Sequence, residues 1–479
     1  MDTRILVPDA RLAELGLQGG EQVAAARAAL DELADQGLGA RKLESALRAV
    51  VRRPRNYRRK DPWRRLAALL LRMPGPEGPP TTGADDLRPR PVPHQVWGRE
   101  LLDRTTLGQL ETAARLPVAV RAAQMPDGHV GYGLPIGGVL ATRGAVIPYA
   151  VGVDIACRMR LSIYDLPASA LETQRDGLRA ALLRETVFGV GQGFEGGARR
   201  QHAVMEDPAW RAQGLLRGLH DRAWAQLGSS GSGNHFVEFG ELETEGVPEL
   251  GLPAGRYLSL LSHSGSRGLG SEIANHFTRV ARGQRRLPKE ASALAWLDLD
   301  SADGQAYWQA MTLAGRYAAA NHELIHVHVA RAAGLQVRAT VENHHNFAWR
   351  EEHDGEELIV HRKGATPAGV GVLGIIPGSM GDAGYVVRGR GAAASLNSAS
   401  HGAGRVMSRK QASAWISRAE RDAWLQRAGV ELLGAGLDES PQAYRRLEQV
   451  MAAQADLVEA IASFTPRLVR MAKGGRAED

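Results

Sequence analysis

The proline- and glycine-rich stretch at residues 74–93 limits the folds open to this chain more than any other sequence feature. It contains seven prolines in PGPEGPPTTGADDLRPRPVP, and proline can neither continue a helix nor donate a backbone hydrogen bond. We therefore predict a semi-rigid linker over residues 74–93. It divides the 479-residue chain into a small N-terminal part and a large C-terminal part.

The residues before the linker predict a small helical N-terminal extension, residues 1–73. The segments VAAARAALDELAD, LESALRAVV and WRRLAALLLR repeat apolar residues at three- and four-residue spacing, the period of an amphipathic helix. The basic segment 52–65 carries eight Arg or Lys residues and one Asp, with Tyr57 and Trp63 between them. This pattern suits contact with nucleic-acid phosphates and stacking on bases. A solvated helix surface or an interdomain contact explains it equally well.

The residues after the linker predict a single large α+β domain of mixed sheets and helices, residues 94–479. Short apolar runs such as AVIPYAVGV, RYLSLLSH and GVLGIIPG alternate with Gly/Ser loops. Helical spacing appears at residues 167–185, 305–333, 408–427 and 440–463. Strands that end in polar loops are typical places for binding and catalytic sites.

The overall composition is that of a globular protein. It is 44% hydrophobic and 23% charged, which excludes an intrinsically disordered chain. No apolar run approaches the roughly 18 residues of a membrane span, and the N-terminus lacks a signal-peptide core. The single cysteine excludes an internal disulfide. We expect a cytoplasmic protein with no membrane partner.

Candidate metal ligands recur along the large domain. Cys157 follows Asp154 by three residues, and a thiolate beside a carboxylate suits a divalent transition metal. Histidines then recur among glycine, serine and asparagine in GNHFVE, LSHSGSR, ENHHN and SHGAGR. A lone histidine is usually a hydrogen-bonded structural residue, and Cys157 alone could be a core residue. Four such motifs beside the Asp154–Cys157 pair favour a functional site.

A competing motif lies within residues 305–333. His322, Glu323 and His326 match the pattern H-E-x-x-H on an expected helix, which is the arrangement of a zinc metalloprotease. The two wildcard positions make this pattern common by chance. We keep the protease as a remote alternative.

Taken together, the motifs resemble the RtcB-type RNA ligase family from about residue 94 to residue 474. Eight strings match in the family's order. They are PDGHVGYGLPIG (126–137), VGVDIAC (151–157), GNHFVE (233–238), HSGSRGLG (263–270), HHNFAW (344–349), HRKGATPA (361–368), IPGSMG (376–381) and SHGAGRVMSR (400–409).

The resemblance implies a GTP- and manganese-dependent enzyme that joins an RNA 3′-phosphate or 2′,3′-cyclic phosphate end to a 5′-hydroxyl end. It implies His401 as the nucleophile that carries GMP. It implies two Mn²⁺ ions held by Asp154, Cys157, His235, His263 and His345, with Cys157 bridging. It implies GTP or GMP contacts from Asn234, Glu238, Asn346, Ser379, Gly404, Tyr444 and Lys473, and RNA phosphate contacts from Arg267 and Lys363. An accessory activator protein is a further candidate partner.

The chain also departs from the family pattern. Ala156 and Arg158 flank Cys157 where the family usually has glycine, and Gly384 stands where a hydroxyl residue is common. The arginine predicts a bulky cation at the rim of the metal site. These departures keep a relative with a shifted substrate open, such as 3′-phosphate capping, DNA ends or ribosomal RNA repair. The alternative that is not an enzyme is an RNA-binding protein that keeps the fold but does not catalyse a reaction.

Overall fold

The computed structural model describes residues 7–8, 11–12, 15, 17, 20–52, 54–58, 60–72 and 85–474. The chain forms two compact units, Met1–Pro80 and Thr81–Asp479. Most of the predicted linker 74–93 lies outside the described residues, and the functional domain boundaries stay predictions. Among the described residues, no helix has the length and apolarity that a membrane crossing requires.

The N-terminal unit is helical. Its described elements are α2 (Gly20–Asp35), α3 (Ala40–Arg52), the 3₁₀ turn η1 (Pro54–Tyr57) and α4 (Arg64–Arg72). The apolar helix faces meet in a core that includes Leu43, Leu47 and Leu66. Trp63 belongs to this core and is only 5% exposed. Our interpretation of Trp63 as a base-stacking residue is therefore wrong, because the indole completes the hydrophobic core between the helices.

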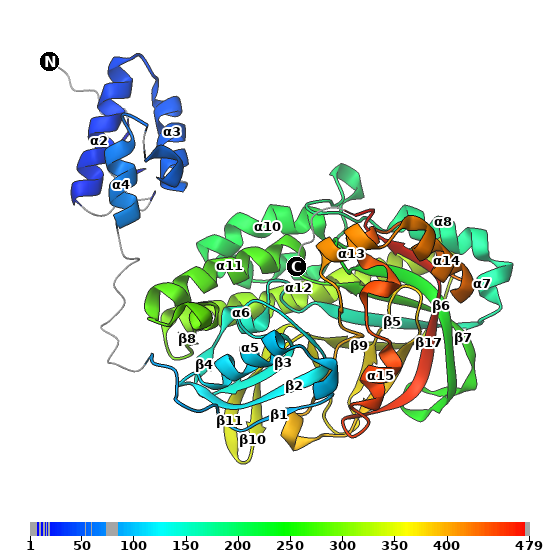
Figure 1. The fold of residues 1–479 in the computed structure, drawn as a ribbon. Helices are drawn as coiled ribbons and strands as arrows, with labels where there is room; N and C mark the ends of the chain where they lie inside the picture. The colour runs from blue at the N-terminus through cyan, green and yellow to red at the C-terminus, as the bar shows by residue number, and fades with distance from the viewer. Residues whose placement is uncertain are drawn as a thin grey trace. The chain divides into compact units, whose positions relative to one another are not determined.

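The large unit is built on two main β-sheets (Figure 1). One has the order β1-β2-β3-β11-β10, and the other β13-β14-β17-β6-β7-β5-β9 with β16 paired to β17. The strands are β1 (His94–Val96), β2 (Ala119–His129), β3 (Ile136–Thr142), β4 (Ala145–Val146), β5 (Arg158–Pro167), β6 (Phe236–Val247), β7 (Leu252–Ser264), β8 (Leu297–Asp298), β9 (Val337–His344), β10 (Phe347–His353), β11 (Glu356–Lys363), β12 (Ala365–Pro367), β13 (Leu373–Ile376), β14 (Gly384–Gly389), β15 (Ser398–Ser400), β16 (Glu431–Leu432) and β17 (Val458–Met471).

Helices pack on one face of the larger sheet, and with the sheets they confirm the predicted α+β class (Figure 1). The α-helices are α5 (Arg104–Ala114), α6 (Pro148–Val151), α7 (Ala170–Thr173), α8 (Arg175–Glu185), α9 (Ala209–Ala212), α10 (Gly214–Gln226), α11 (Arg267–Gln284), α12 (Ala302–Ala333), α13 (Arg409–Trp415), α14 (Arg418–Ala428) and α15 (Leu447–Ala452). Short 3₁₀ turns η2 to η9 connect them. Leu182 of α8 and Ile325 of α12 are buried in one cluster with Phe239 and Leu260 of the sheet.

The expected helix at residues 440–463 is wrong. The described chain has the 3₁₀ turn η9 (Pro441–Ala443) and the short α15 there and then enters β17, which runs between β14 and β6. Its sequence VEAIASFTPRLVRM contains helix-favouring Ala and Glu, but pairing on both sides within a sheet overrides such local preference. Pro466 is accommodated at a shift of register between β17 and β6, a position that tolerates a missing N–H donor.

The register of the strands brings the site residues together where the ends of β5, β6, β7 and β9 meet in the larger sheet. Arg158 at the start of β5 pairs with Ser264 at the end of β7 and with His344 at the end of β9. Phe236 at the start of β6 pairs with His263. Because these neighbours are antiparallel, the beginnings of β5 and β6 coincide with the ends of β7 and β9. Residues that immediately precede β5 and β6, or end β7 and β9, therefore lie together.

Asn343 joins two strands at opposite ends of the larger sheet's strand order. Its side-chain oxygen accepts from the backbone N–H of Ile375 at 2.9 Å, and its amide nitrogen donates to the Ile375 carbonyl at 3.2 Å. The side chain thus imitates a backbone pair between β9 and β13. This contact fixes the end of β9 next to the site.

Candidate metal and nucleotidyl-transfer site

Five buried donor residues converge at these strand ends in two groups that share Cys157. One group is Cys157, His263 and His345, and the other is Asp154, Cys157 and His235. The Cys157 Sγ lies 3.0 Å from Nε2 of His263 and 3.5 Å from Nε2 of His235. Nε2 of His263 is 3.2 Å from Nε2 of His345. Thiolate, imidazole and carboxylate donors at these separations fit two divalent transition metals with the thiol between them.

Backbone carbonyls orient two of the imidazoles. Nδ1 of His235 lies 2.8 Å from the Ser230 carbonyl, and Nδ1 of His263 lies 3.1 Å from the Asn234 carbonyl. A carbonyl oxygen can only accept a hydrogen bond, so each Nδ1 carries the proton. Each Nε2 is therefore unprotonated, and its lone pair faces the cluster and can bind a metal. This outer support is the usual way in which a protein fixes a histidine ligand.

Asp154 is held so that one oxygen remains available. Its Oδ1 accepts from the Ser266 backbone N–H at 3.0 Å. Its Oδ2 is buried without a hydrogen-bond partner and lies 3.1 Å from Nε2 of His235. A Cβ at Gly265 would lie 2.1 Å from this carboxylate, so only glycine leaves room for it. A buried carboxylate oxygen without a donor is costly unless a cation completes its shell, which fits a metal ligand.

Two imidazoles of this cluster, those of His263 and His345, have lowered pKa values. Burial lowers the pKa of His263 from 6.5 to about 3, and burial also lowers the pKa of His345 well below its ordinary value. Neutral imidazole is the form that binds a metal. His263 and His345 are therefore in the required state at neutral pH.

The segments that carry Cys157 and His345 hold each other in an unusual backbone conformation. The Ala156 N–H donates to the Asn346 carbonyl at 2.8 Å, and the His345 N–H donates to the Cys157 carbonyl at 2.9 Å. Ala156 has φ 56° and Asn346 has φ 57°. Asparagine tolerates this left-handed region, but alanine adopts it at a cost. Strain of this kind is a common feature of functional sites.

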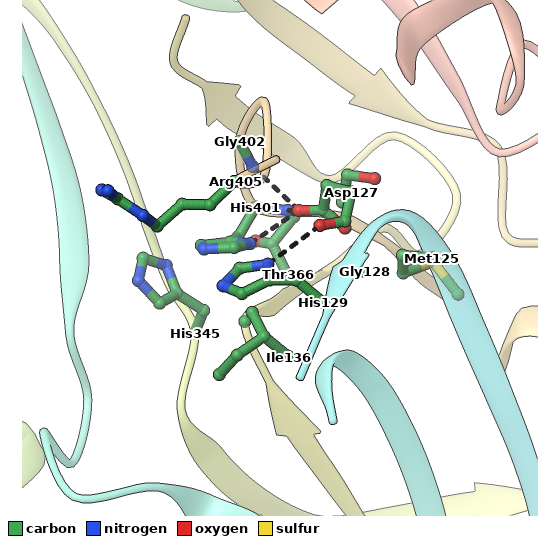
Figure 2. A network of polar contacts seen from close by, with 12 residues as sticks. Met125, Asp127, Gly128, His129, Ile136, His345, Thr366, His401, Gly402 and Arg405 are labelled. Atoms are coloured by element: carbon green, nitrogen blue, oxygen red, sulfur yellow. Dashed lines mark hydrogen bonds and ion pairs between the residues drawn. The ribbon is translucent and has the colours of Figure 1, made fainter. Parts of the chain in front are cut away.

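His401 follows β15 and is oriented by Asp127, which lies in β2 (Figure 2). Nδ1 of His401 lies 2.7 Å from Asp127 Oδ2, and the backbone N–H groups of His401 and Gly402 donate to the same oxygen at 3.0 and 3.2 Å. Asp127 is fully buried. Because the carboxylate accepts a hydrogen bond from Nδ1–H, the lone pair of His401 is on Nε2. The His401 ring is stacked edge to face 4.9 Å from that of His345.

One pocket, here called the central pocket, contains both the metal donors and His401. Its lining includes all five metal-site residues and most of the nucleotide-site residues expected from the sequence. These are Asp154, Cys157, His235, His263, His345, His401, Asn234, Glu238, Asn346, Ser379, Gly404 and Tyr444. Lys473 is exposed and lies outside the lining, so its nucleotide contact stays a prediction.

The nucleotide-site residues form a polar wall of the central pocket. Burial raises the pKa of Glu238 well above its ordinary value, so the carboxyl is suited to exchange hydrogen bonds with a ligand. Ser379 donates to Asp382 at 2.5 Å. Arg405 donates to the Tyr444 hydroxyl at 3.0 Å. A Cβ at Gly404 would lie 2.1 Å from the Asp127 carbonyl, so glycine is required for this wall to pack beside Asp127.

Lys363 and Arg267 do not reach the central pocket. Lys363 lines an adjoining pocket and donates to the Tyr132 carbonyl at 2.5 Å. Burial lowers the pKa of Lys363 from 10.5 to about 7. The Arg267 side chain is buried, and its guanidinium donates to Ser229 Oγ and to the carbonyls of Gly189 and Gln192. Arg267 thus braces the 189–192 loop, a placement that does not favour direct phosphate contact.

Arg158 lies away from the pocket rim, contrary to our expectation of a bulky cation there. Its side chain is only 11% exposed and pairs with Glu342 at 2.9 Å. Arg160 pairs with the same carboxylate. The register of β5 with β9 explains this placement, because it puts Arg160 opposite Glu342 and Arg158 two residues away. The structure therefore gives Arg158 a packing role beside the cluster.

The zinc-protease alternative is wrong. His322 and His326 are buried and both hydrogen bond to Ser262 Oγ, at 2.7 and 2.8 Å. Glu323 points away from them, with a side chain that is 52% exposed and 3.5 Å from His202. A zincin needs both imidazoles and the glutamate around one metal. In the part of the chain that the structure describes, these histidines belong to neither metal-binding group.

Sequence reasoning missed the orienting residues. Asp127, His129, Arg405 and Glu439 lie in or beside the central pocket, and none was assigned a role. Nδ1 of His129 lies 3.2 Å from the Asp127 carbonyl, and burial lowers the pKa of His129 to about 4. The only sequence feature that could have indicated a role for Asp127 was its position inside the PDGHVGYG motif.

Comparison with known proteins identifies the family. A family model described as "tRNA-splicing ligase RtcB" matches residues 109–472. The RNA-splicing ligase RtcB of Escherichia coli K12 is 34% identical over 416 residues, which cover 80% of this chain and 98% of that protein. The RNA-splicing ligase RtcB of Mycobacterium tuberculosis H37Rv is 34% identical, covering 75% of this chain and 98% of that protein. The tRNA-splicing ligase RtcB of Thermococcus kodakarensis is 31% identical, with 80% and 95% covered.

The family match thus indicates a ligase, and the site holds paired metal-binding groups beside an oriented histidine. The chain belongs to the RtcB RNA ligase family. The resemblance inferred from the eight sequence motifs is confirmed.

Proposed function

We propose that this protein joins an RNA 3′-phosphate or 2′,3′-cyclic phosphate end to a 5′-hydroxyl end, with GTP as co-substrate and His401 as the guanylylated residue. The observation that carries this proposal is the contact between His401 Nδ1 and Asp127 Oδ2, 2.7 Å long, beside the paired metal-binding groups. It leaves Nε2 of His401 as a nucleophile.

The first step is the attack of Nε2 on the α-phosphorus of GTP. A nitrogen–phosphorus bond forms, the bond to the β-phosphate oxygen breaks, and pyrophosphate leaves. The ring becomes cationic while Nδ1 keeps its proton. The buried Asp127 carboxylate, which accepts this N–H, stabilises the charge as the orienting carboxylate of a catalytic triad does.

The later steps return His401 to its neutral form. An oxygen of the RNA 3′-phosphate attacks the phosphorus of the histidine-bound GMP, and the nitrogen–phosphorus bond breaks. The product is an RNA-(3′)pp(5′)G end. The 5′-hydroxyl of the second strand then attacks the 3′-phosphate, loses its proton and displaces GMP. A 2′,3′-cyclic phosphate is first opened by water to the 3′-phosphate.

The two donor groups fit a pair of Mn²⁺ ions. Asp154, Cys157 and His235 would hold one ion, and Cys157, His263 and His345 the other, with Cys157 shared. When bound, such ions supply positive charge that neutralises phosphoryl oxygens during transfer. Because the donors include a thiol, a reducing cytoplasm is the compartment that we propose.

The remaining assignments follow from placement. We propose that GTP or GMP is bound by the nucleotide-site residues that line the central pocket, Asn234, Glu238, Asn346, Ser379, Gly404 and Tyr444. Lys473 does not line this pocket, and its contact with the nucleotide is also a proposal. Lys363 is proposed to contact RNA phosphate. Arg267 is not proposed to contact RNA phosphate. We propose instead that it positions the 189–192 loop. An accessory activator protein remains a candidate partner.

A ligation assay with defined ends tests this function. Two RNAs, one with a 3′-phosphate and one with a 5′-hydroxyl, are incubated with protein, GTP and Mn²⁺. The proposal predicts a joined product and GMP. Accumulation of RNA-ppG without joining would instead support end capping, and joining of matched DNA but not RNA would support a DNA-repair role. Absence of any modified end overturns the proposal.

A further inference from the structure

We infer that the ring of Tyr132 is a stacking platform for a nucleobase near the reacting 3′-phosphate end of the RNA. This inference rests on the proposed function, and it adds a substrate-binding residue that neither the sequence motifs nor the metal site identified. Three observations carry it: the exposure of the ring, the anchoring of its loop and the continuity of its pocket with the central pocket.

Tyr132 is unusually exposed for an aromatic residue beside a catalytic pocket. Its side chain is 69% exposed, and its neighbours Val130 and Val406 are 50% and 56% exposed. Among the described residues, the Tyr132 side chain has no hydrogen bond, ion pair or ring contact. An exposed apolar rim of this kind marks a contact surface for a ligand.

The loop that presents Tyr132 is anchored on several sides. Gln109 donates to the Gly131 carbonyl at 2.6 Å and accepts from the Gly131 N–H at 3.0 Å. Lys363 donates to the carbonyl of Tyr132 itself at 2.5 Å. Leu134 is fully buried. The backbone that carries the ring is therefore held in place before any ligand binds, which reduces the entropic cost of stacking.

The pocket beside Tyr132, here called the adjoining pocket, leads to the site of chemistry. It has a volume of about 610 Å³ and shares Asp154, His129 and Asn346 with the lining of the central pocket. Arg405 and Arg409 line both pockets and pair with Glu439, and Lys363 lines the adjoining pocket. A strand whose 3′-phosphate reaches His401 would therefore pass basic side chains with its backbone and find an aromatic face for its base.

The combination favours a single-stranded RNA end over a protein partner. Single-stranded nucleic acids are bound by cationic grooves that carry aromatic platforms, because every base has a face for stacking. A protein docking on the rim would cover the entrance to the central pocket. The occupant must instead deliver a phosphate to that entrance.

Equilibrium binding tests this inference with the full-length protein. The probe is a short RNA with a 3′-phosphate, and its affinity is measured by fluorescence anisotropy for wild type, Tyr132→Ala and Tyr132→Phe. Trp415→Ala is the matched control, because Trp415 is 66% exposed but lines neither pocket. A second probe carries abasic nucleotides at its 3′ end. Thermal unfolding of each variant verifies the fold.

We expect Tyr132→Ala to weaken binding by roughly 5- to 100-fold, the usual effect of losing one stacked base. Tyr132→Phe and Trp415→Ala should bind as wild type does. Wild type should bind the abasic probe more weakly, and Tyr132→Ala should add no further loss on that probe. Equal affinity of Tyr132→Ala and wild type for the intact probe overturns the inference and leaves the rim to a protein partner. Binding of the probe requires no ligation. A failure of the proposed ligase function would therefore be distinguished from a failure of this inference.

Discussion

His401 and Asp127 are joined by a 2.7 Å contact between imidazole Nδ1 and carboxylate Oδ2, although 274 residues separate them in the chain. Two backbone N–H groups converge on the same oxygen. The loop after β15 and the strand β2 are thus tied at a single buried atom. This arrangement fixes both the direction and the tautomer of the imidazole, which decides which nitrogen can react.

Asp127→Asn should lower the rate of guanylylation on the order of 100-fold or more, because an amide in this place favours the wrong tautomer of His401. The rate is followed as incorporation of α-phosphate-labelled GTP in single-turnover conditions. Metal content and thermal unfolding verify that the pocket is intact. A rate within threefold of wild type would show that the carboxylate is a structural anchor only.

Removing donors one at a time should separate the two metal groups. His345→Ala should lose one bound Mn²⁺ and Asp154→Ala should lose the other, whereas Cys157→Ala should weaken both because its thiol belongs to both groups. Bound Mn²⁺ per chain is measured after equilibrium dialysis. His322→Ala serves as a control, since it is buried near the cluster without belonging to it. Two tightly bound ions in Cys157→Ala would refute the shared thiol.

Ala156→Gly should stabilise the protein by about 1 kcal/mol, because glycine adopts φ 56° without the strain of a Cβ. The change in unfolding free energy is measured by urea denaturation. Ala113→Gly in α5 is the matched control, a buried helical alanine, and it should destabilise by about 1 kcal/mol. Destabilisation by both substitutions alike would mean that the left-handed conformation stores no strain.

Lys363 should make stability depend on pH between about 7 and 10. Its pKa is about 7 in the folded protein and about 10.4 in an unfolded chain, so the unfolded state binds more protons in this window and stability rises with pH. Below pH 7 the cost of burying the ammonium is fully present. The advantage in Tm of Lys363→Met over wild type should therefore shrink from pH 7 to 10. A constant difference would contradict the lowered pKa.

Removing residues 1–80 should weaken RNA binding and flatten its dependence on salt, because we expect the basic segment 52–65 to contact RNA phosphates. Arg58, Lys60, Arg64 and Arg65 are exposed in the N-terminal unit. Asp85 is retained because it accepts from the Arg286 N–H at 2.9 Å. RNA affinity is measured over a series of salt concentrations. An unchanged slope would assign the segment to structure or to a protein partner.

The resemblance to the RtcB family predicted the convergence of the metal donors. Asp154 and Cys157 lie in one motif, and His235, His263 and His345 each lie in another. The sequence did not reveal Asp127, whose role depends on bonds to residues 274 positions away. It misplaced Trp63, since aromatic residues between arginines look alike whether exposed or in a core. It misread residues 458–463 as helical because strand pairing, which is non-local, overrides the local preference of Ala and Glu.

The most direct test of the central claim is the covalent attachment of GMP to His401. The protein is incubated with α-phosphate-labelled GTP and Mn²⁺ without RNA, denatured, and the labelled peptide is identified by mass spectrometry. We predict one phosphoramidate at His401 in wild type and in His276→Ala, whose histidine lies outside the central pocket, and no label in His401→Ala. Equal labelling of His401→Ala, or no label on wild type, would contradict the account.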